Sequence, residues 1–236
     1  MPELVEGVPA RVLAVYAHPD DPDVSCGGTL ARWARGGAEV HVVICTNGDK
    51  GTSDPAADPI ALARRRLAEA AKAADLLGVT GQQVLGYPDG ELVDDHALRA
   101  RLVATIRQLR PVTVLCPDPT AVFFGEDYFN HRDHRVVGFA VLDALSPAAA
   151  LPHYFPEAGA AHQVETVLMS GTLEPSVWVD VTGTIEEKVD AVSCHRSQFA
   201  DGGEWARRAV RLRAEEDGRR AGVAFAEGFR RLRLGA

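Results

Sequence analysis

The stretch RVLAVYAHPDDP, residues 11–22, decides the fold of this 236-residue chain. Its first half, Arg11–Tyr16, is a short apolar run that ends at a turn, a pattern that predicts a buried β-strand. Its second half is rich in turn-forming residues. Because a strand that is apolar throughout is typical of a parallel sheet covered on both faces, the stretch favours an α/β fold.

Strand and helix patterns alternate along the rest of the chain. Further strands are predicted over Glu39–Cys45, Gln83–Leu85, Val112–Cys116, Val164–Met169 and Val177–Val181. Helices are predicted from Ser25 to Gly36 and over Ile60–Leu77, Ala97–Leu109, His131–Leu145, Glu186–Ser197 and Glu204–Arg220. The alternation predicts βαβ units, and hence a Rossmann-like three-layer α/β fold with a mostly parallel sheet. We expect a single domain over residues 1–236, with the active site at the C-terminal ends of the strands.

The charge of the chain argues against a nucleic-acid partner. It has 33 acidic and 25 basic residues and a formal net charge of −8, whereas phosphate binding draws on clustered lysine and arginine. The arginine-rich tail, Arg207–Arg233, has acidic residues among its arginines. That mixture is typical of a surface helix rather than of a nucleic-acid arm.

The cysteines and the N-terminus predict a cytoplasmic protein. The four cysteines are scattered without a CxxC pair, which favours free thiols in a reducing compartment. The N-terminus lacks the order of a signal peptide, and no apolar run approaches the length of a membrane span. The oligomeric state stays open, and a homo-oligomer is one of the expected forms.

Two short clusters of histidine and aspartate follow predicted strands. The first is HPDD, residues 18–21, and the second is NHRDH, residues 130–134, at the start of a predicted helix. Histidine nitrogen and carboxylate oxygen are ligands that zinc favours, and a hydrolytic zinc site keeps one position open for water. His131 and His134 lie three residues apart, so that they project from one face of the helix. Together the clusters predict a metal site that activates water.

Each cluster also has a purely structural interpretation. Asp-Asp-Pro at 20–22 is a good turn or helix-entry signal, and Asn130 could cap the helix that follows, with His134 packed beside the core. Either motif alone favours that interpretation, but the pair at two strand ends favours the metal site. The turn after the first strand has no Gly-x-Gly-x-x-Gly, which argues against a dinucleotide site. A metal- or nucleotide-binding module without hydrolytic activity remains the alternative.

Ala-His-Pro-Asp-Asp at 17–21, with a His-x-Asp-His farther on, resembles the PIG-L/LmbE-like de-N-acetylase family. Further segments resemble that family in the same order along the chain. They are TNGD at 46–49, the helix around Arg66-x-x-Glu69, YPDGEL at 87–92, and Lys188 with HRSQ at 195–198. This ordered agreement, from about Val12 to about Gln198, is more specific than either short motif.

The resemblance implies a zinc-dependent hydrolase that removes an N-acetyl group from a small polar substrate similar to N-acetylglucosamine. It implies that His18, Asp21 and His134 bind the metal. Asp20 would be the general base, and His131 would stabilise the oxyanion or act as an acid. Another acyl group or another amide bond remains an alternative substrate, and Fe(II) or another divalent ion suits the same ligands.

The resemblance also implies roles for residues around the ligands. Arg66 and Asp89 would face the hydroxyl groups of the substrate, and Asp133 would orient a histidine from behind. Arg66 and Asp89 also fit a surface helix residue and a turn residue, respectively. Pro22 stands where the family commonly has a glutamate. We expect the hydrogen bond of that glutamate to be absent or to be supplied by Asp23.

Overall fold

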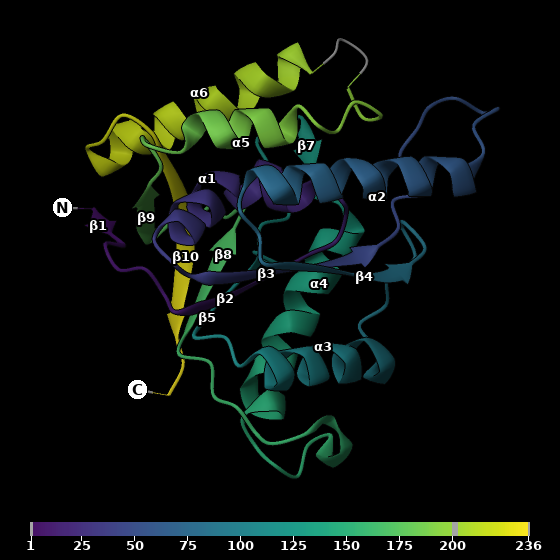
Figure 1. Ribbon diagram of the computed structural model, residues 1–236, viewed down its shortest axis with the longest axis vertical. Coiled ribbons are helices and arrows are strands. Elements are labelled where there is room, and N and C mark those ends of the chain that lie inside the picture. The colour runs from purple at the N-terminus through teal and green to yellow at the C-terminus, as the bar shows by residue number, and fades with distance from the viewer. Residues whose placement is uncertain (1, 200–202, 236) are drawn as a thin grey trace.

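An eight-stranded sheet with the strand order β1-β9-β10-β8-β5-β2-β3-β4 runs through the molecule (Figure 1). The structure is a computed structural model and describes residues 2–199 and 203–235. The strands are β1 (Glu3–Leu4), β2 (Arg11–Tyr16), β3 (Glu39–Thr46), β4 (Gly81–Tyr87), β5 (Thr113–Pro117), β8 (Thr166–Ser170), β9 (Val177–Asp180) and β10 (Ala226–Arg233). A separate two-stranded hairpin is formed by β6 (Phe123–Phe124) and β7 (Tyr128–Phe129).

Helices cover both faces of the sheet, as Figure 1 shows, with α1, α2, α5 and α6 on one side and α3 and α4 on the other. Their bounds are α1 (Asp21–Arg35), α2 (Pro59–Leu76), α3 (His96–Leu109), α4 (Arg132–Asp143), α5 (Ile185–Val192) and α6 (Glu204–Ala221). A short π-helix (Ala144–Ala149) and a 3₁₀ turn (Pro156–Ala158) follow α4.

Strand β2 is buried on both faces, because its alternate side chains pack in two hydrophobic cores. Leu13 and Val15 pack in the core with residues of α3 and α4. Val12, Ala14 and Tyr16 pack in the core with residues of α1 and α2. Since β2 also pairs in parallel with β3 and β5, the predicted three-layer α/β fold with a mostly parallel sheet is confirmed.

Helix α1 begins earlier than the sequence predicted, at Asp21 rather than Ser25. Pro22 occupies the first turn, where a missing N–H costs no helical hydrogen bond. The backbone leaves helical geometry at Cys26, with φ −146° and ψ 19°, so that the predicted start lies just before a kink. At the other end the helix stops before Gly36, as expected. Helix α5 is shorter than predicted and ends at Val192.

The arginine-rich tail was predicted as a surface helix, and this prediction is wrong for its last part. The helix α6 ends at Ala221, and the chain then forms β10, antiparallel to both β8 and β9. Phe229 in β10 is fully buried, whereas Arg230 and Arg231 are only partly covered. Pairing on both sides of the strand therefore outweighs the helical tendency of the arginines. No helix in the described part of the chain is long and apolar enough to cross a membrane.

Candidate active site and metal centre

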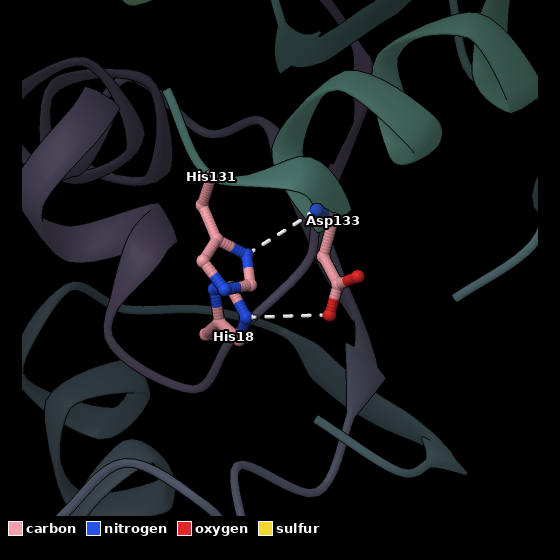
Figure 2. Close-up of side chains that lie close together, drawn as sticks. All are labelled: His18, His131 and Asp133. Carbon is pink, nitrogen blue, oxygen red and sulfur yellow. Dashed lines mark hydrogen bonds and ion pairs between the residues drawn. The ribbon is translucent and has the colours of Figure 1, made fainter. Parts of the chain in front are cut away.

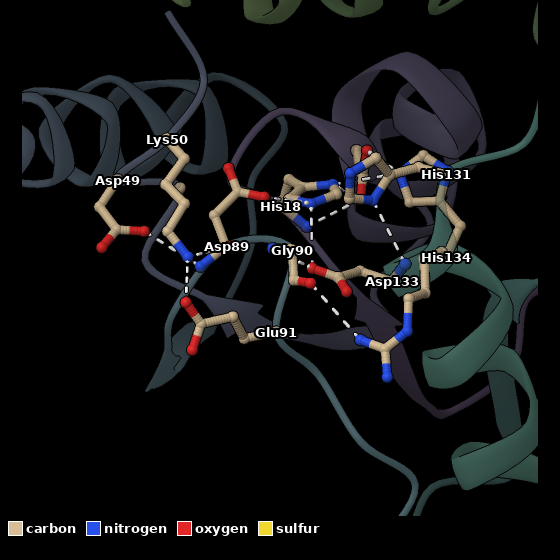
Figure 3. A network of polar contacts seen from close by, with 12 residues as sticks. His18, Asp49, Lys50, Asp89, Gly90, Glu91, His131, Asp133 and His134 are labelled. Atoms are coloured by element: carbon tan, nitrogen blue, oxygen red, sulfur yellow. Dashed lines mark hydrogen bonds and ion pairs between the residues drawn. The ribbon is translucent and has the colours of Figure 1, made fainter.

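The loops at the carboxyl ends of the parallel strands bring the predicted site residues together. His18 and Asp21 follow β2, Asp89 follows β4, and His131 and His134 lie beyond β5 at the start of α4. Figure 3 shows His18, Asp89, His131 and His134 converging, although His18 and His134 are 116 positions apart in the chain. The edge of a parallel sheet thus holds the site, as is usual in α/β proteins.

The three predicted metal ligands meet at one point. His18 Nδ1 lies 3.1 Å from His134 Nε2 and 3.3 Å from Asp21 Oδ2, and His134 Nε2 lies 3.1 Å from Asp21 Oδ1. Two ligand atoms each about 2.1 Å from one tetrahedral zinc ion lie roughly 3.4 Å apart. These spacings therefore fit a single cation bound by two histidines and one carboxylate. The backbone N–H of His18 donates to Asp21 Oδ2 at 2.8 Å and holds that carboxylate in the turn.

Asn130 fixes the orientation of the His134 ring. Its Oδ1 lies 2.9 Å from His134 Nδ1, so that Nδ1 carries the proton. The lone pair of Nε2 then points toward His18 Nδ1 and Asp21. The Asn130 side chain is itself anchored, because its Nδ2 donates to the carbonyl of Ala121 at 2.8 Å. Asn130 does not cap α4; His131 does so, by accepting the Asp133 N–H.

Two buried carboxylates lie behind the His18 ring. Its Nε2 lies 3.1 Å from Asp89 Oδ1 and 3.6 Å from Asp133 Oδ2, although neither approach is aligned as a hydrogen bond. Asp133 is held in turn by the N–H of Gly90, which donates to its Oδ2 at 2.7 Å. With Nε2 directed at these carboxylates, Nδ1 of His18 is left to bind a cation.

His18, His131 and Asp133 form a second group of potential ligands (Figure 2). His131 Nδ1 accepts the backbone N–H of Asp133 at 3.2 Å and is therefore occupied. The first group has the lone pairs of both histidines directed at one point, and it is the better cation site.

The electrostatics of the first group, His18, Asp21 and His134, favour positive charge, and these three residues are called the ligand group below. Burial would lower the pKa of His18, but Asp21, Asp133 and Asp89 together raise it to about 12. For His134, burial is likewise outweighed by Asp21, and the pKa is raised. Burial would raise the pKa of Asp21, but the two histidines hold it well below its usual range. A position that stabilises imidazolium so strongly is suited to a metal cation.

Arg66 joins Asp20 to the rest of the site. Its guanidinium is buried and donates to Asp20 Oδ1 and to the carbonyl of Gly48, both at 3.0 Å, and lies 3.5 Å from Asp89 Oδ2. Gly48 has φ +66°, and a Cβ there would come within 2.7 Å of Arg66 Nη1. The structure thus places Arg66 and Asp89 beside the ligands, and their contact with substrate hydroxyls stays a prediction.

Asp20 lies next to the ligand group without being part of it. It is the N-cap residue of α1, but its side chain makes no capping hydrogen bond. Its carboxylate is partly exposed, with 21% of the side-chain surface accessible, and is held by Arg66. Asp20 also lines a cavity together with Asp21.

Asp23 does not lie among the ligands. It is buried, and its Oδ2 lies 2.6 Å from His195 Nε2, which ties α1 to the segment after α5. The pair links the first motif to the HRSQ segment at 195–198, whose Ser197 hydroxyl and N–H donate to the carboxylate of Glu69.

Sequence reasoning missed several of the supporting contacts. Asn130 was weighed only as a helix cap, and Lys50 was not considered. Lys50 Nζ donates to the carbonyl of Asp89 at 2.8 Å and pairs with Glu91, and Asp49 Oδ1 accepts the N–H of Asp89 at 3.0 Å (Figure 3). The polar residues TNGDK at 46–50 directly after a strand were the available signal.

The fold and this geometry define an α/β protein with a candidate cation site of two histidines and one carboxylate. The model of the PIG-L family, described as GlcNAc-PI de-N-acetylase, matches residues 13–145, which is more than half of the chain. The chain belongs to the PIG-L family, and it is an enzyme of the deacetylase class of hydrolases.

Known relatives agree in sequence and in structure. A diacetylchitobiose deacetylase of Thermococcus kodakarensis is 35% identical over 225 residues, which cover 93% of this chain and 82% of the relative. A 1D-myo-inositol 2-acetamido-2-deoxy-alpha-D-glucopyranoside deacetylase of Rhodococcus opacus is 30% identical, over 80% of this chain and 81% of the relative. The structure of an N,N'-diacetylchitobiose deacetylase from Pyrococcus horikoshii superposes with a TM-score of 0.87 at 31% identity, covering 95% of this chain and 84% of that one.

Proposed function

We propose that this enzyme uses a divalent cation, zinc in the first instance, to remove the N-acetyl group of a small amino-sugar substrate. The observation that carries the proposal is the convergence of His18 Nδ1, Asp21 and His134 Nε2 beside the carboxylate of Asp20. Support for the substrate class comes from the relatives, which are named as deacetylases of acetamido sugars.

His18, Asp21 and His134 would hold the cation, because their ligand atoms lie within 4.8 Å of one another. When bound, such a cation polarises the amide carbonyl and lowers the pKa of a water molecule beside it. Asn130 keeps His134 in the tautomer that leaves Nε2 unprotonated, and the carboxylates of Asp89 and Asp133 lie on the Nε2 side of His18, which leaves Nδ1 for the cation.

Asp20 is proposed as the general base. Arg66 holds Oδ1 of the carboxylate at 3.0 Å, and no described residue accepts or donates a hydrogen bond at Oδ2. A carboxylate that is fixed by one oxygen and open at the other can take a proton from water at the cation. Asp20 precedes Asp21 in the chain and lines the same cavity, and on this ground we assign the role of base to it rather than to Asp89 or Asp133.

His131 is proposed to donate a hydrogen bond to the developing oxyanion. Because its Nδ1 accepts the Asp133 N–H, a neutral ring carries its proton on Nε2. Burial, together with His18 and His134, lowers the pKa of His131, so that the ring is neutral at pH 7. A neutral imidazole with a fixed Nε2–H can stabilise the oxyanion without first losing a proton.

Amine release from N-acetylglucosamine and from diacetylchitobiose, with zinc-loaded and chelator-treated enzyme, tests the proposal. We expect release of acetate and free amine in equal amounts by the loaded enzyme only. Hydrolysis of a longer N-acyl chain but not of N-acetyl would favour the alternative of a different acyl group. Zinc binding without hydrolysis of any N-acyl sugar would favour the binding module.

We also infer a cytoplasmic location. Cys26, Cys45, Cys116 and Cys194 are all free, and the first three are buried. Free thiols are the expected state in a reducing compartment, which supports the prediction made from the sequence.

A further inference from the structure

Two adjoining cavities open beside the ligand group. One, of about 330 Å³, lies between α1, α6 and β10 and is lined by Asp20 and Asp21. The other, of about 280 Å³, is lined by Asp21 and His134 and reaches the β6–β7 hairpin. Each is close to the lower limit for a small-molecule pocket. Because Asp21 and Arg213, among others, line both, the two cavities form one space.

The wall of this space away from the ligands lies outside the segment that the family model matches. It comes from α6 and β10, whereas the family model matches residues 13–145 only. Its apolar part includes Ala206, Ala209 and Val210 of α6, together with Phe199 from the segment after α5. Such a surface suits the carbon skeleton of a ligand but does not select its polar groups.

Most charged groups that line the larger cavity already have partners. Glu227 accepts from Lys188 Nζ at 2.5 Å and from the N–H groups of Gly28 and Thr29 at 3.0 and 2.8 Å. Asp217 accepts from the N–H of Gly228 at 3.3 Å and lies 3.9 Å from Arg220. Asp20 is held by Arg66, and Asp21 belongs to the ligand group.

Arg213 is the exception. Within residues 2–199 and 203–235 its guanidinium has no carboxylate within 4.0 Å and makes no hydrogen bond, and Asp217, one turn along α6, acts on it only through charge. Its side chain is exposed and lines both cavities beside Asp21. An arginine that makes no ion pair and lines the same cavities as Asp21 is available to a ligand, and its planar fork matches carboxylate and phosphate oxygens.

We propose that Arg213 is a specificity-determining residue that binds an anionic group, a carboxylate or a phosphate, on the substrate whose N-acetyl group lies at the cation site. The enzyme then acts on a small anionic N-acetylated amino sugar in preference to a neutral one. The inference rests on the proposed function for the position of the N-acetyl group. In the reaction, water adds to the amide carbon, the C–N bond breaks, and acetate and the protonated amine leave.

The test compares one neutral and two anionic probes: N-acetylglucosamine, its 6-phosphate, and N-acetylmuramic acid, which carries a carboxylate. We expect kcat/KM for at least one anionic probe to exceed that for the neutral probe at least tenfold in the wild type. Arg213→Gln is expected to bring this ratio close to one, mainly through KM, and Arg213→Lys to keep part of it. Preference for the phosphate or for the carboxylate probe identifies which anion is bound.

Arg208→Gln is the matched control, because Arg208 is an exposed arginine of the same helix and lines neither cavity. It makes the same change in net charge and should leave the ratio as in the wild type. Equal kcat/KM for neutral and anionic probes in the wild type, or an equal loss in both variants, would overturn the inference.

Binding separates the inference from the proposed function. The affinity of Asp20→Asn enzyme for N-acetylglucosamine 6-phosphate, with and without Arg213→Gln, is measured by calorimetry at low and high salt. At least tenfold weaker and less salt-dependent binding in the double variant supports the anion site, even if no probe is hydrolysed. Hydrolysis without anion preference overturns the inference alone, and neither hydrolysis nor Arg213-dependent binding overturns both.

Discussion

Asn130 shows how one hydrogen bond can decide the chemistry of a neighbouring histidine. Its Oδ1 and the Nδ1 of His134 lie 2.9 Å apart, and this contact selects the tautomer that can bind a cation. The motif NHRDH predicted that two histidines lie at the start of one helix, but it did not predict which ring nitrogen is unprotonated. The tautomer of His134 depends on the orientation of the Asn130 side chain, which is fixed by its hydrogen bond to the carbonyl of Ala121.

Asn130→Ala is therefore expected to weaken zinc binding by roughly 10- to 100-fold, the usual cost of losing such a supporting contact. Asn130→Asp keeps an acceptor at Nδ1 and should restore most of the affinity. Competition with a chromophoric chelator measures both. Equal affinities in Asn130→Ala and the wild type would show that His134 does not depend on Asn130.

The pKa values of the ligands predict how zinc binding depends on pH. Asp21, with Asp133 and Asp89, raises the pKa of His18 to about 12, and Asp21 raises the pKa of His134, so the metal-free site favours the protonated form of both rings. Zinc must displace these protons, and acid favours them. The apparent zinc affinity should thus fall as the pH is lowered from 8 to 6, with proton release on binding. Calorimetry in buffers of different ionisation enthalpy measures both, and an affinity independent of pH would contradict the ligand assignment.

At the scale of elements, β10 marks the limit of reasoning from local sequence. Its residues AEGFRRLR have no strong strand pattern, and their arginines resemble those of the preceding helix. They form a strand because they pair with β8 on one side and with β9 on the other. Pairing between segments that are distant in sequence cannot be read from a local pattern. By contrast, β2, β3 and β5 could be predicted because both of their faces are apolar.

Glu227 of β10 also anchors α1. Its carboxylate, paired with Lys188, accepts the N–H groups of Gly28 and Thr29, and both charged side chains are at most 5% exposed. Glu227→Gln would leave the Lys188 ammonium buried without its counter-charge. We expect the free energy of unfolding to fall by about 3 kcal/mol, as for other broken buried pairs. Urea denaturation measures this change.

Glu186→Gln provides the control, because Glu186 pairs with Arg211 at the surface. An exposed ion pair contributes little to the free energy of unfolding, and its loss should leave the urea midpoint as in the wild type. Equal midpoints for the Glu227 and Glu186 variants would show that the buried pair does not hold β10 to α1.

At the scale of the whole molecule, the sequence predicted the layers and the edge of the sheet at which the site lies. It did not predict the space around that site. Helix α6 was foreseen, but its position against α1 and β10, and hence the cavity with Arg213, depends on packing between distant segments. The motif residues were predictable because strand ends in a parallel sheet share one edge.

Metal removal should destabilise the folded molecule. A cation held by residues from the loop after β2 and from α4 binds only the folded chain, and a hundredfold excess over the dissociation constant adds about 2.7 kcal/mol. We expect chelation to lower the melting temperature by several degrees and zinc to restore it. Calcium should not restore the melting temperature, because it prefers oxygen ligands to histidine nitrogen. An unchanged melting temperature after complete removal of metal would argue against a cation that bridges these elements.

The most direct test of the central claim is to measure bound zinc and deacetylation in the same preparations of the wild type and of Asp20→Asn. Asp20 lies beside the ligands but is not one of them, so both proteins should hold about one zinc per chain. The wild type should release amine from an N-acetylated amino sugar, whereas Asp20→Asn should be slower by about 10²- to 10⁴-fold, the range expected for loss of a general base. Zinc in neither protein, or equal rates in both, would contradict the assignment of a metal-dependent deacetylase with Asp20 as its base.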